Sequence, residues 1–505
     1  LEKNEELKSV LLQESPWVRE AASETERRQR IALLFDLNKL ASEQSAALKK
    51  LGDMQNSNGS WPWFPGMPDS RYITQHIVTG LGHLTALKVI DPLKDNAILY
   101  KLSMALQYLD TTMRADFEKI KKQDKDYQKN NHLGYEDMQY LYARSYFLTT
   151  HPLEKDMDEL LRYYKAQSAK YWNTQNNYMK GMMALYLNRY GDQKTALLIM
   201  RSLKETALHN EETGMYWRDN QSSWYWFQAP IETQALLIEA FDEVSHDMQS
   251  VEEMKVWLLK QKQTQDWKTT RATTEAIYAL LLRGTSLLAS DKQVDITLGD
   301  EKVNPYKEGG IQPEAGTGYF KTSWDASAII PQMGKVTVTN PNPTVAWGAM
   351  YWQYFEQLDK ITPAQTPLSL SKKLFHEMDT PTGPVIEPIT ENAILKVGDR
   401  VVVRIELRSD RNMEYLHLKD MRASAFEPVK VLSGYRYQGG LGYYESTLDA
   451  STNFFISYLP KGTFVFEYKL TATQKGEFSN GITSIQCMYA PEFSSHSEGI
   501  RIRVQ

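Results

Sequence analysis

The sequence predicts a multidomain chain in which an α/α toroid is followed by antiparallel β-sandwich domains. Three observations predict this fold class: the length of 505 residues, a helical first half that repeats itself, and a second half in which apolar residues alternate. At roughly 100–200 residues per domain, the chain is long enough for several domains. Hydrophobic residues make up 42% and charged residues 24% of the sequence, a composition that is ordinary for globular proteins.

Up to about residue 285, apolar residues recur at helical spacing, as Ile77, Leu81 and Leu84 do. A unit made of a Gly/Trp turn followed by a helix occurs more than once. The tryptophans Trp61, Trp226 and Trp267 precede the segments 74–77, 233–237 and 274–277. Because repeated helical hairpins bury a shared core only when several of them stack, we expect residues 1–285 to close into an α/α toroid.

After residue 285, the apolar period falls to two and turn residues become frequent. Val403, Ile405 and Leu407 alternate with charged residues, as in a half-buried strand. Further strands are expected at Val336–Thr339, Tyr415–Leu418, Phe454–Tyr458, Phe464–Leu470 and Ile500–Val504. The proline-containing stretch 362–367 divides this half, so we expect a β segment at residues 286–364 and a β-sandwich at residues 365–505.

Composition excludes several classes of partner and site. The 58 basic and 63 acidic residues give a net charge of −5 without a basic stripe, so no nucleic-acid partner is expected. No stretch reaches the roughly 20 apolar residues of a transmembrane helix. The single cysteine, Cys487, excludes an internal disulfide and a multi-cysteine metal site. Since the first residue is Leu1, we take the chain as a piece of a longer protein.

No metal or cofactor is expected. The sequence has no HExxH motif, and His76 and His83 stand seven residues apart, about 10 Å along a helix axis. Two histidines at that separation cannot chelate one ion, so we interpret both as packed or hydrogen-bonded. The glycines at 439–442 do not open a helix as a phosphate-binding loop must, and a strand turn is the better interpretation.

A toroid also suggests enzymes. A terpene cyclase needs clustered aspartates, but Asp110 is solitary, and a prenyltransferase needs a zinc-bound thiolate, but Cys487 lies far along the chain. A glycoside hydrolase or polysaccharide lyase stays open as an alternative, with Glu232 and Glu275 as a carboxylate pair. Tryptophans that could stack on sugar rings in such an enzyme are Trp61, Trp63, Trp224, Trp226 and Trp267. Because both glutamates occupy near-equivalent repeat positions close to helix starts, we favour a structural interpretation and expect no enzyme.

Several motifs of the second half carry a resemblance to a known family. They are Gly398–Val403, Tyr415–Asp420, Phe426–Pro428, Leu459–Phe464, Gly476–Phe478 and Met488–Glu492. In this order they resemble the last macroglobulin-like domain of bacterial alpha-2-macroglobulins. The helical half, with its turn at 55–61 and the segment 70–74, is similar to the thioester-containing toroid of that family. The segment between them resembles the returning half of its CUB-like domain.

The resemblance implies a broad-spectrum proteinase inhibitor. In the family, a proteinase cleaves a bait segment, the molecule rearranges and traps the proteinase, and an internal thioester acylates it. An activated acyl group of this kind must be kept from water until it is needed. The partners implied are target proteinases and upstream macroglobulin domains of the same protein. The location implied is the bacterial periplasm or cell envelope.

The chain departs from the family at the thioester. The family motif is Cys-x-Glu-Gln, whereas Cys487 is followed by Met488, Tyr489 and Ala490. Cys487 is therefore expected to be a buried small hydrophobe. The segment 41–44, Ala-Ser-Glu-Gln, is interpreted as helix surface. We expect the motif to lie upstream of Leu1, because residues 1–34 continue into a helical domain; a thioester-free structural envelope protein is the other alternative.

The resemblance also implies shielding residues. The family places a Met-Tyr pair over the thioester pocket, and this pair maps onto Met488 and Tyr489. A second shield from a toroid helix maps onto Tyr135, and His132 is the nearby alternative, where an imidazole could catalyse acyl transfer. Interdomain packing alone would explain all of these positions equally well.

Overall fold

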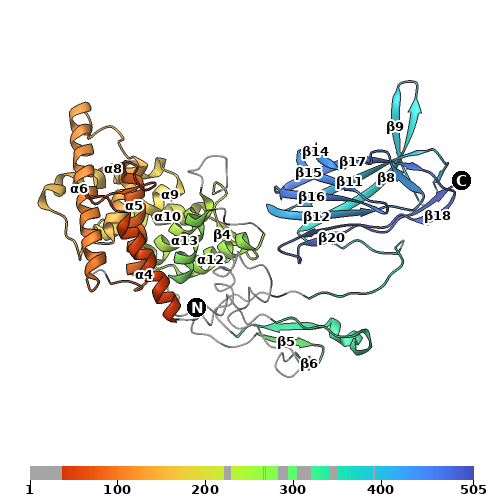
Figure 1. Ribbon diagram of the computed structural model, residues 1–505, viewed down its shortest axis with the longest axis horizontal. Coiled ribbons are helices and arrows are strands. Elements are labelled where there is room, and N and C mark those ends of the chain that lie inside the picture. Colours follow the sequence, from red (N-terminus) through yellow and green to blue (C-terminus); the bar gives the residue numbers. More distant parts are fainter. Residues whose placement is uncertain are drawn as a thin grey trace. The chain divides into compact units, whose positions relative to one another are not determined.

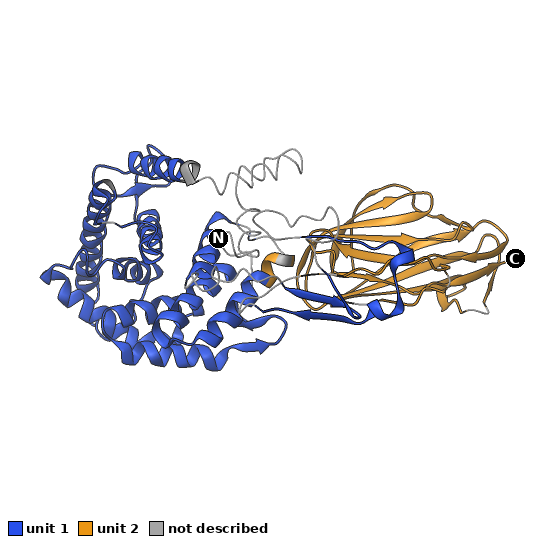
Figure 2. Ribbon diagram, turned by 90° about the horizontal axis from the view of Figure 1, so that it is seen from below, with its two compact units in different colours: residues 1–259, 267–347 blue, residues 260–266, 348–505 orange. Residues whose placement is uncertain are grey.

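The computed structural model describes residues 37–91, 93–220, 229–264, 267, 269–282, 294–303, 320–341, 348, 350–358, 360–364, 366–390 and 393–505 (Figure 1). The chain divides into two compact units, residues 1–259 with 267–347 and residues 260–266 with 348–505 (Figure 2). We describe each unit by itself. The predicted limits of three domains, 1–285, 286–364 and 365–505, stay predictions.

The first unit contains the α/α toroid that the repeats predict. Its inner helices are α5 (Arg71–Ala86), α7 (Tyr135–Ser145), α9 (Asn177–Arg189), α11 (Pro230–Ala240) and α13 (Thr270–Leu281), each packed against the next. The other helices are α4 (Leu37–Asp53), α6 (Asn96–Gln123), α8 (Asp158–Tyr171), α10 (Gln193–Thr206) and α12 (Met248–Thr264). Among these, α6 packs on α5 and α10 packs on α9.

Two of the turns are attached to the helix before them by a tryptophan. The indole Nε of Trp61 donates to the carbonyl of Leu51 in α4 at 2.8 Å, and that of Trp217 donates to Leu203 in α10 at 2.9 Å. Gly214 precedes Trp217 with φ +72°, and a Cβ there would lie 2.0 Å from a backbone oxygen of α12. Only glycine allows the backbone at position 214 to come this close to the backbone of α12. The glycine therefore lets the turn pack directly on that helix.

Polar side chains start the inner helices. Ser70 caps α5 by accepting from the amide of Ile73, Asn176 caps α9 in the same way, and Thr269 caps α13. Such caps satisfy amides that have no partner in the first helical turn. Each cap therefore fixes where its inner helix begins and which residues lie in the first turn.

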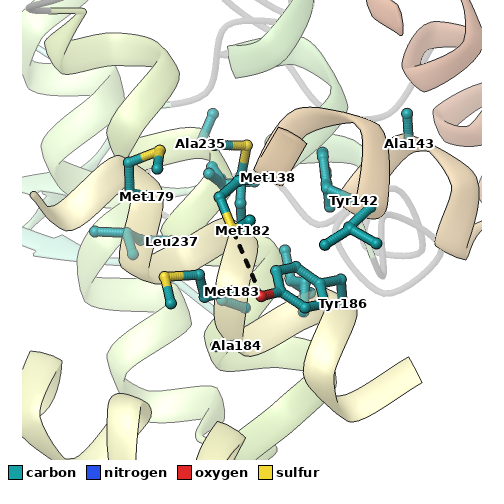
Figure 3. Close-up of a cluster of buried hydrophobic side chains, with 14 of the residues drawn as sticks. Met138, Tyr142, Ala143, Met179, Met182, Met183, Ala184, Tyr186, Ala235 and Leu237 are labelled. Carbon is teal, nitrogen blue, oxygen red and sulfur yellow. Dashed lines mark hydrogen bonds between the residues drawn. The ribbon is translucent and has the colours of Figure 1, made fainter. Parts of the chain in front are cut away.

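The core of the toroid is rich in methionine (Figure 3). Met138 of α7 and Met179, Met182 and Met183 of α9 are buried together, and the hydroxyl of Tyr186 lies 3.5 Å from the sulfur of Met138. Unbranched thioether chains fill irregular gaps between helices that differ in sequence. The continuous buried cluster extends from Trp61 to Leu280, so the predicted repeats share one core.

Short strands follow the toroid. Strands β5 (Asp295–Leu298), β6 (Glu301–Lys302) and β7 (Val336–Thr339) form an antiparallel sheet with β5 in the middle. The toroid itself carries two short hairpins, β1 (Trp61–Pro62) with β2 (Asp69–Ser70) and β3 (Leu208–Asn210) with β4 (Gly214–Tyr216).

The second unit is a β-sandwich. One sheet has the order β13-β17-β11-β8-β9 and the other β14-β15-β16-β12-β19-β20. The bounds of the first are β8 (Leu368–Thr380), β9 (Gly383–Pro388), β11 (Arg400–Ser409), β13 (Phe426–Pro428) and β17 (Gly462–Ala472). Those of the second are β12 (Met413–Met421), β14 (Gly434–Gln438), β15 (Leu441–Thr447), β16 (Ser451–Leu459), β19 (Thr483–Cys487) and β20 (Ser494–His496). A small third sheet joins β10 (Ile394–Leu395), β21 (Arg501–Val504) and β18 (Gly476–Ser479).

The alternation that predicted the strands also places the sandwich core. Val401, Val403, Ile405 and Leu407 of β11 are buried against residues of β12 and β16 from the other sheet. Inside this core, Lys372 of β8 forms a 2.5 Å ion pair with Asp420 of β12, and neither side chain is exposed. Asp420 also accepts hydrogen bonds from Thr483 and Tyr468.

The sequence predictions about these elements are confirmed where the structure describes them. The predicted strands all lie in or overlap observed strands, and the glycines at 439–442 connect β14 to β15 as a turn. Cys487 is buried and free, and residues 41–44 lie on the exposed surface of α4. Residues 1–34 lie outside the described residues.

Candidate functional site

The inner helices bring five side chains together where they begin. Tyr72, Tyr178 and Arg271 are each the second residue of their helix, Tyr135 is the first residue of α7, and His76 follows one turn into α5. We call Tyr72, His76, Tyr135, Tyr178 and Arg271 the tyrosine–arginine cluster. Neighbouring helices of a ring start at the same end, which is why residues nearly 200 positions apart in sequence meet here.

Hydrogen bonds and ring contacts connect the cluster. The guanidinium of Arg271 donates to the hydroxyl of Tyr178 at 2.8 Å and to that of Tyr72 at 3.3 Å. The rings of Tyr135 and Tyr178 stack with centroids 6.1 Å apart, and Tyr72 meets His76 edge to face at 4.4 Å. Burial, and then the charge of Arg271, lower the pKa of His76 to about 3, so its imidazole is neutral at physiological pH.

A neighbouring arginine is fully engaged. Arg71 donates to Asp116 at 2.5 Å, to Asp137 at 3.0 Å and to Gln75 at 2.7 Å. Burial raises the pKa of Asp137, and the Arg71 charge opposes that rise. The guanidinium of Arg71 therefore ties α5 to α6 and α7 and is not free for a ligand.

Further along the same helices lies a second polar group, the ring-centre network. Its members are His83, Tyr142, Tyr146, Arg189, Glu239 and Tyr278. The buried carboxylate of Glu239 accepts from the hydroxyls of Tyr142, Tyr146 and Tyr278 and forms a 2.6 Å ion pair with Arg189. Arg189 also pairs with Glu243 at 2.5 Å. One carboxylate thus joins α7, α9, α11 and α13.

The tyrosine hydroxyls of the ring-centre network stay protonated. Burial, and then the charge of Glu239, raise the pKa of Tyr142, Tyr146 and Tyr278 well above the usual value, so these hydroxyls stay protonated as donors. His83 donates to or accepts from Tyr142 at 3.1 Å, and burial lowers its pKa to about 3. A network whose members satisfy one another rigidifies the ring.

The two glutamates of the carboxylate-pair alternative lie in the wall of the toroid. Glu232 is buried in the first turn of α11, while Glu275 of α13 lies 3.8 Å from His83 Nδ1. Burial raises the pKa of Glu275 to about 7, against the opposing charge of Arg271. Trp61 and Trp267 are buried in the core, so they do not face a sugar-binding groove, and Trp224 and Trp226 lie outside the described residues.

The histidine interpretations hold in the structure. His83 is hydrogen-bonded and stacked, and His76 is packed against Tyr72. Across the described ranges, no group of three or more metal-ligating side chains is placed to hold an ion. His132, the alternative acyl-transfer residue, is 2.9 Å from the carboxylate of Asp124. The hydrogen bond from Asn130, and then the one from His132, lower the pKa of Asp124.

The predicted lid residues Met488 and Tyr489 follow β19 and are 56% and 78% exposed. Tyr489 contacts Tyr415 edge to face at 5.5 Å, and the amide of Met488 donates to the carbonyl of Tyr415 at 2.9 Å. Tyr415, the third residue of β12, has φ +56°, a strained conformation for a residue with a side chain. These contacts hold the Met-Tyr pair at the surface of its own unit, and its role as a lid stays a prediction.

The sequence analysis names Tyr135, whose shielding role stays a prediction, but does not name the residues around it, Tyr72, Tyr178 and Arg271. A usable signal exists, because Tyr72, Tyr178 and Arg271 each stand two residues after the capping residues Ser70, Asn176 and Thr269. Aligning the repeats on their helix starts, in place of their tryptophans, would have placed these side chains at one end of the ring.

Residues 368–492 match the family described as the bacterial alpha-2-macroglobulin MG10 domain. Trypsin-activated alpha-2-macroglobulin from Escherichia coli aligns with 96% of this chain at 10% identity and a TM-score of 0.39, and the match spans 30% of that chain. Native E. coli alpha-2-macroglobulin from domain MG7 to the C-terminus aligns with 99% at 11% identity and a TM-score of 0.32, over 72% of that chain. Circularly permutated Ras protein 2 of Dictyostelium discoideum is 25% identical over 115 residues, 22% of this chain and 3% of its own length.

The second unit is a macroglobulin-type β-sandwich, preceded in the chain by an α/α toroid. Residues 368–492 therefore belong to the bacterial alpha-2-macroglobulin MG10 domain family, as the motifs of this segment predict. It spans about a third of the length of the trypsin-activated relative. None of the described helices has the length and hydropathy that crossing a lipid bilayer requires.

Proposed function

We propose that this chain is the C-terminal part of a broad-spectrum proteinase inhibitor that traps its target after bait cleavage. The observation that carries the proposal is the match of residues 368–492 to the MG10 domain of bacterial alpha-2-macroglobulins. The proposal includes upstream macroglobulin domains in the same protein, and a periplasmic or cell-envelope location. Structures of relatives activated by trypsin and by porcine elastase support proteinases as the partner class.

The proposed capture chemistry is acylation by a thioester whose Cys-x-Glu-Gln motif lies upstream of Leu1. Cys487 cannot supply the thiol, because it is buried in the sandwich core and Met488, Tyr489 and Ala490 follow it. Burial also raises the pKa of the Cys487 thiol, which disfavours the reactive thiolate. Met488, Tyr489 and Tyr135 are the proposed shield that keeps water from the acyl group.

Two features support the shielding role. Met488 and Tyr489 present apolar surface that their own unit does not cover, and Tyr489 is braced by Tyr415. Tyr135 stands at the start of an inner helix, stacked on Tyr178. Exposed side chains that are nevertheless held in place are suited to docking, because little conformational entropy is lost on contact.

Methylamine tests the capture chemistry. The full-length parent protein is incubated with labelled methylamine, and the modified peptides are identified by mass spectrometry. A labelled glutamine in a Cys-x-Glu-Gln motif upstream of Leu1 establishes the thioester. Absence of label overturns this part of the proposal and favours a thioester-free envelope protein.

The shield is tested by the rate of the same reaction. Met488→Gly and Tyr489→Gly in the parent protein should speed methylamine incorporation, because water and amine then reach the acyl group. Tyr435→Gly is the matched control, since Tyr435 is also an exposed tyrosine but lies on β14 at the far edge of the same sheet. Equal rates in all variants would remove Met488 and Tyr489 from the proposed site.

A further inference from the structure

A lysine and an aspartate face each other in the core of the β-sandwich. Lys372 lies on β8 of the five-stranded sheet, and Asp420 lies on β12 of the six-stranded sheet. The amine nitrogen Nζ is 2.5 Å from Asp420 Oδ1, and neither side chain has any exposed surface. The carboxyl carbon Cγ is one bond beyond that oxygen, so it lies within about 3.7 Å of Nζ. A nucleophilic group and the carbon that it can attack are thus held together across the two sheets.

The pair is isolated from water and from other charges. Lys372 occupies an inward position of β8, where the alternation otherwise places leucines. Among the described residues, neither Lys372 nor Asp420 has a second ion-pair partner within 4.0 Å. Another buried lysine, Lys255 of the toroid, pairs at 3.3 Å with Glu252, whose side chain is 48% exposed. Water reaches that carboxylate, whereas it does not reach Asp420.

Burial changes the balance between the charged and the neutral forms of the pair. Water stabilises an ammonium and a carboxylate, and a dry core removes this solvation. The transfer of one proton from Nζ to the carboxylate of Asp420 gives a neutral amine and a neutral carboxylic acid. These are the two forms that condense to an amide, because only the neutral amine has a lone pair for attack.

The neighbours of Asp420 are placed to assist such a condensation. The hydroxyl of Thr483 donates to Oδ1 at 2.5 Å, and that of Tyr468 donates to Oδ2. Burial, and then the charge of Asp420, raise the pKa of Tyr468 well above its usual value, so its hydroxyl stays a donor. Donors on both oxygens polarise the carboxyl group and stabilise the oxyanion that forms on attack. The carbonyl of Met421 accepts from Nζ at 2.8 Å and orients the amine.

We propose that Lys372 and Asp420 condense to an isopeptide bond that joins the two sheets of the sandwich. Nζ attacks Cγ, the Nζ–Cγ bond forms and the Cγ–Oδ2 bond breaks. Of the three protons of the lysine ammonium, one stays on the amide nitrogen and two leave with Oδ2 as water. The reaction is not a redox step, and it needs no further reactant. The remaining N–H keeps its hydrogen bond to Met421, and Thr483 donates to the new amide carbonyl.

The bond joins strands whose linked residues are 48 positions apart in sequence. A cross-link of this kind restricts the unfolded chain, and the two sheets cannot separate while it is intact. The reaction needs neither bait cleavage nor a thioester, so it stands apart from the proposed proteinase inhibition.

The mass of the chain tests the proposal. The intact 505-residue chain is purified, denatured and weighed by mass spectrometry at once and after one week at room temperature. We expect the chain to lose the mass of one water molecule, about 18 Da, relative to its sequence. Digestion should give a branched peptide that joins the segment of Lys372 to the segment of Asp420. Trypsin should not cut after Lys372, because its amine is then acylated.

Variants locate the reaction. Lys372→Arg keeps a cation but removes the amine and should retain the full mass, whereas Lys373→Arg, at the exposed next residue, should lose water like the unaltered chain. Asp420→Asn should lose ammonia, about 17 Da, because ammonia is then the leaving group. Tyr468→Phe should slow the loss at least about tenfold, as the removal of an oxyanion donor does. Should Lys372→Arg fail to fold, the branched peptide of the unaltered chain still decides.

Three results would overturn the proposal. They are the full sequence mass after one week, a loss of water that peptide mapping places within a single segment, and an undiminished loss in a folded Lys372→Arg. In each case Lys372 and Asp420 remain an ion pair. An unchanged rate in Tyr468→Phe would remove Tyr468 from the reaction.

Discussion

His83 and Tyr278 stack face to face, with ring centroids 3.6 Å apart and planes at 3°. His83 lies in α5, the first inner helix, and Tyr278 lies in α13, the last, so this contact closes the ring between segments far apart in sequence. Two further links across the same seam are the hydrogen bond from Arg271 to Tyr72 and the 3.8 Å contact of Glu275 with His83. Closure therefore rests on side chains that come together only when every helix between them has packed.

Tyr278→Ala should destabilise the toroid by about 3–5 kcal/mol, because it removes the stack and leaves a cavity in the core. Tyr278→Phe keeps the stack and loses only the hydroxyl that donates to Glu239, so about 1 kcal/mol is expected. Urea unfolding followed by circular dichroism measures both. Equal costs for the two variants would contradict closure by stacking.

Glu239→Leu should cost about 3–5 kcal/mol of unfolding free energy, since it leaves three buried tyrosine hydroxyls without their acceptor and removes the more buried of the two carboxylates that pair with Arg189. Glu243→Leu is the matched control, because Glu243 also pairs with Arg189 but is 33% exposed and leaves Glu239 in place. The control should cost less than about 1 kcal/mol. A larger loss of stability from Glu243→Leu than from Glu239→Leu would contradict the central place of Glu239 in the ring-centre network.

Glu275 should make the stability of the toroid depend on pH. Burial raises its pKa from 4.5 to about 7, so the unfolded chain releases this proton at lower pH than the folded chain does. Stability is then lost as the pH rises from about 4.5 to 7, by roughly 3 kcal/mol for a shift of this size. Below pH 4.5 both states are protonated and the effect vanishes.

Glu275→Gln checks this prediction. The variant should be more stable than the unaltered chain at pH 8 and equally stable at pH 4, as measured by urea unfolding at each pH. Glu205→Gln, which alters an exposed glutamate of α10, controls for the loss of one negative charge. A gain from Glu275→Gln that is the same at pH 4 as at pH 8 would exclude the proton linkage.

In the sandwich, Lys372→Met should cost about 3–5 kcal/mol, because Asp420 is left as an unpaired buried charge. Lys373→Met is the control, since the next residue along β8 points to solvent. The double variant Lys372→Met with Asp420→Leu should recover part of the loss. The rest stays lost, because Thr483 and Tyr468 then lack an acceptor. No recovery in the double variant would show that the pair itself stabilises the fold.

The sequence predicted the elements better than the contacts between them. Alternation in β11 and helical spacing in α5 are local patterns, so fold class and strand positions followed from them. The role of Cys487 as a buried hydrophobe followed from its motif context. By contrast, Arg271 and Tyr178 belong to separate helices whose convergence depends on ring closure, so local patterns could not predict the hydrogen bond between them.

The central claim, proteinase trapping by the parent protein, is tested most directly with trypsin and two substrates. The full-length parent is mixed with trypsin, and cleavage of a large protein substrate and of a small chromogenic peptide is followed in parallel. Trapping predicts that a stoichiometric amount of parent protein suppresses cleavage of the large substrate while the small peptide is still cleaved. Undiminished cleavage of the large substrate, with the parent protein simply degraded, would contradict the account.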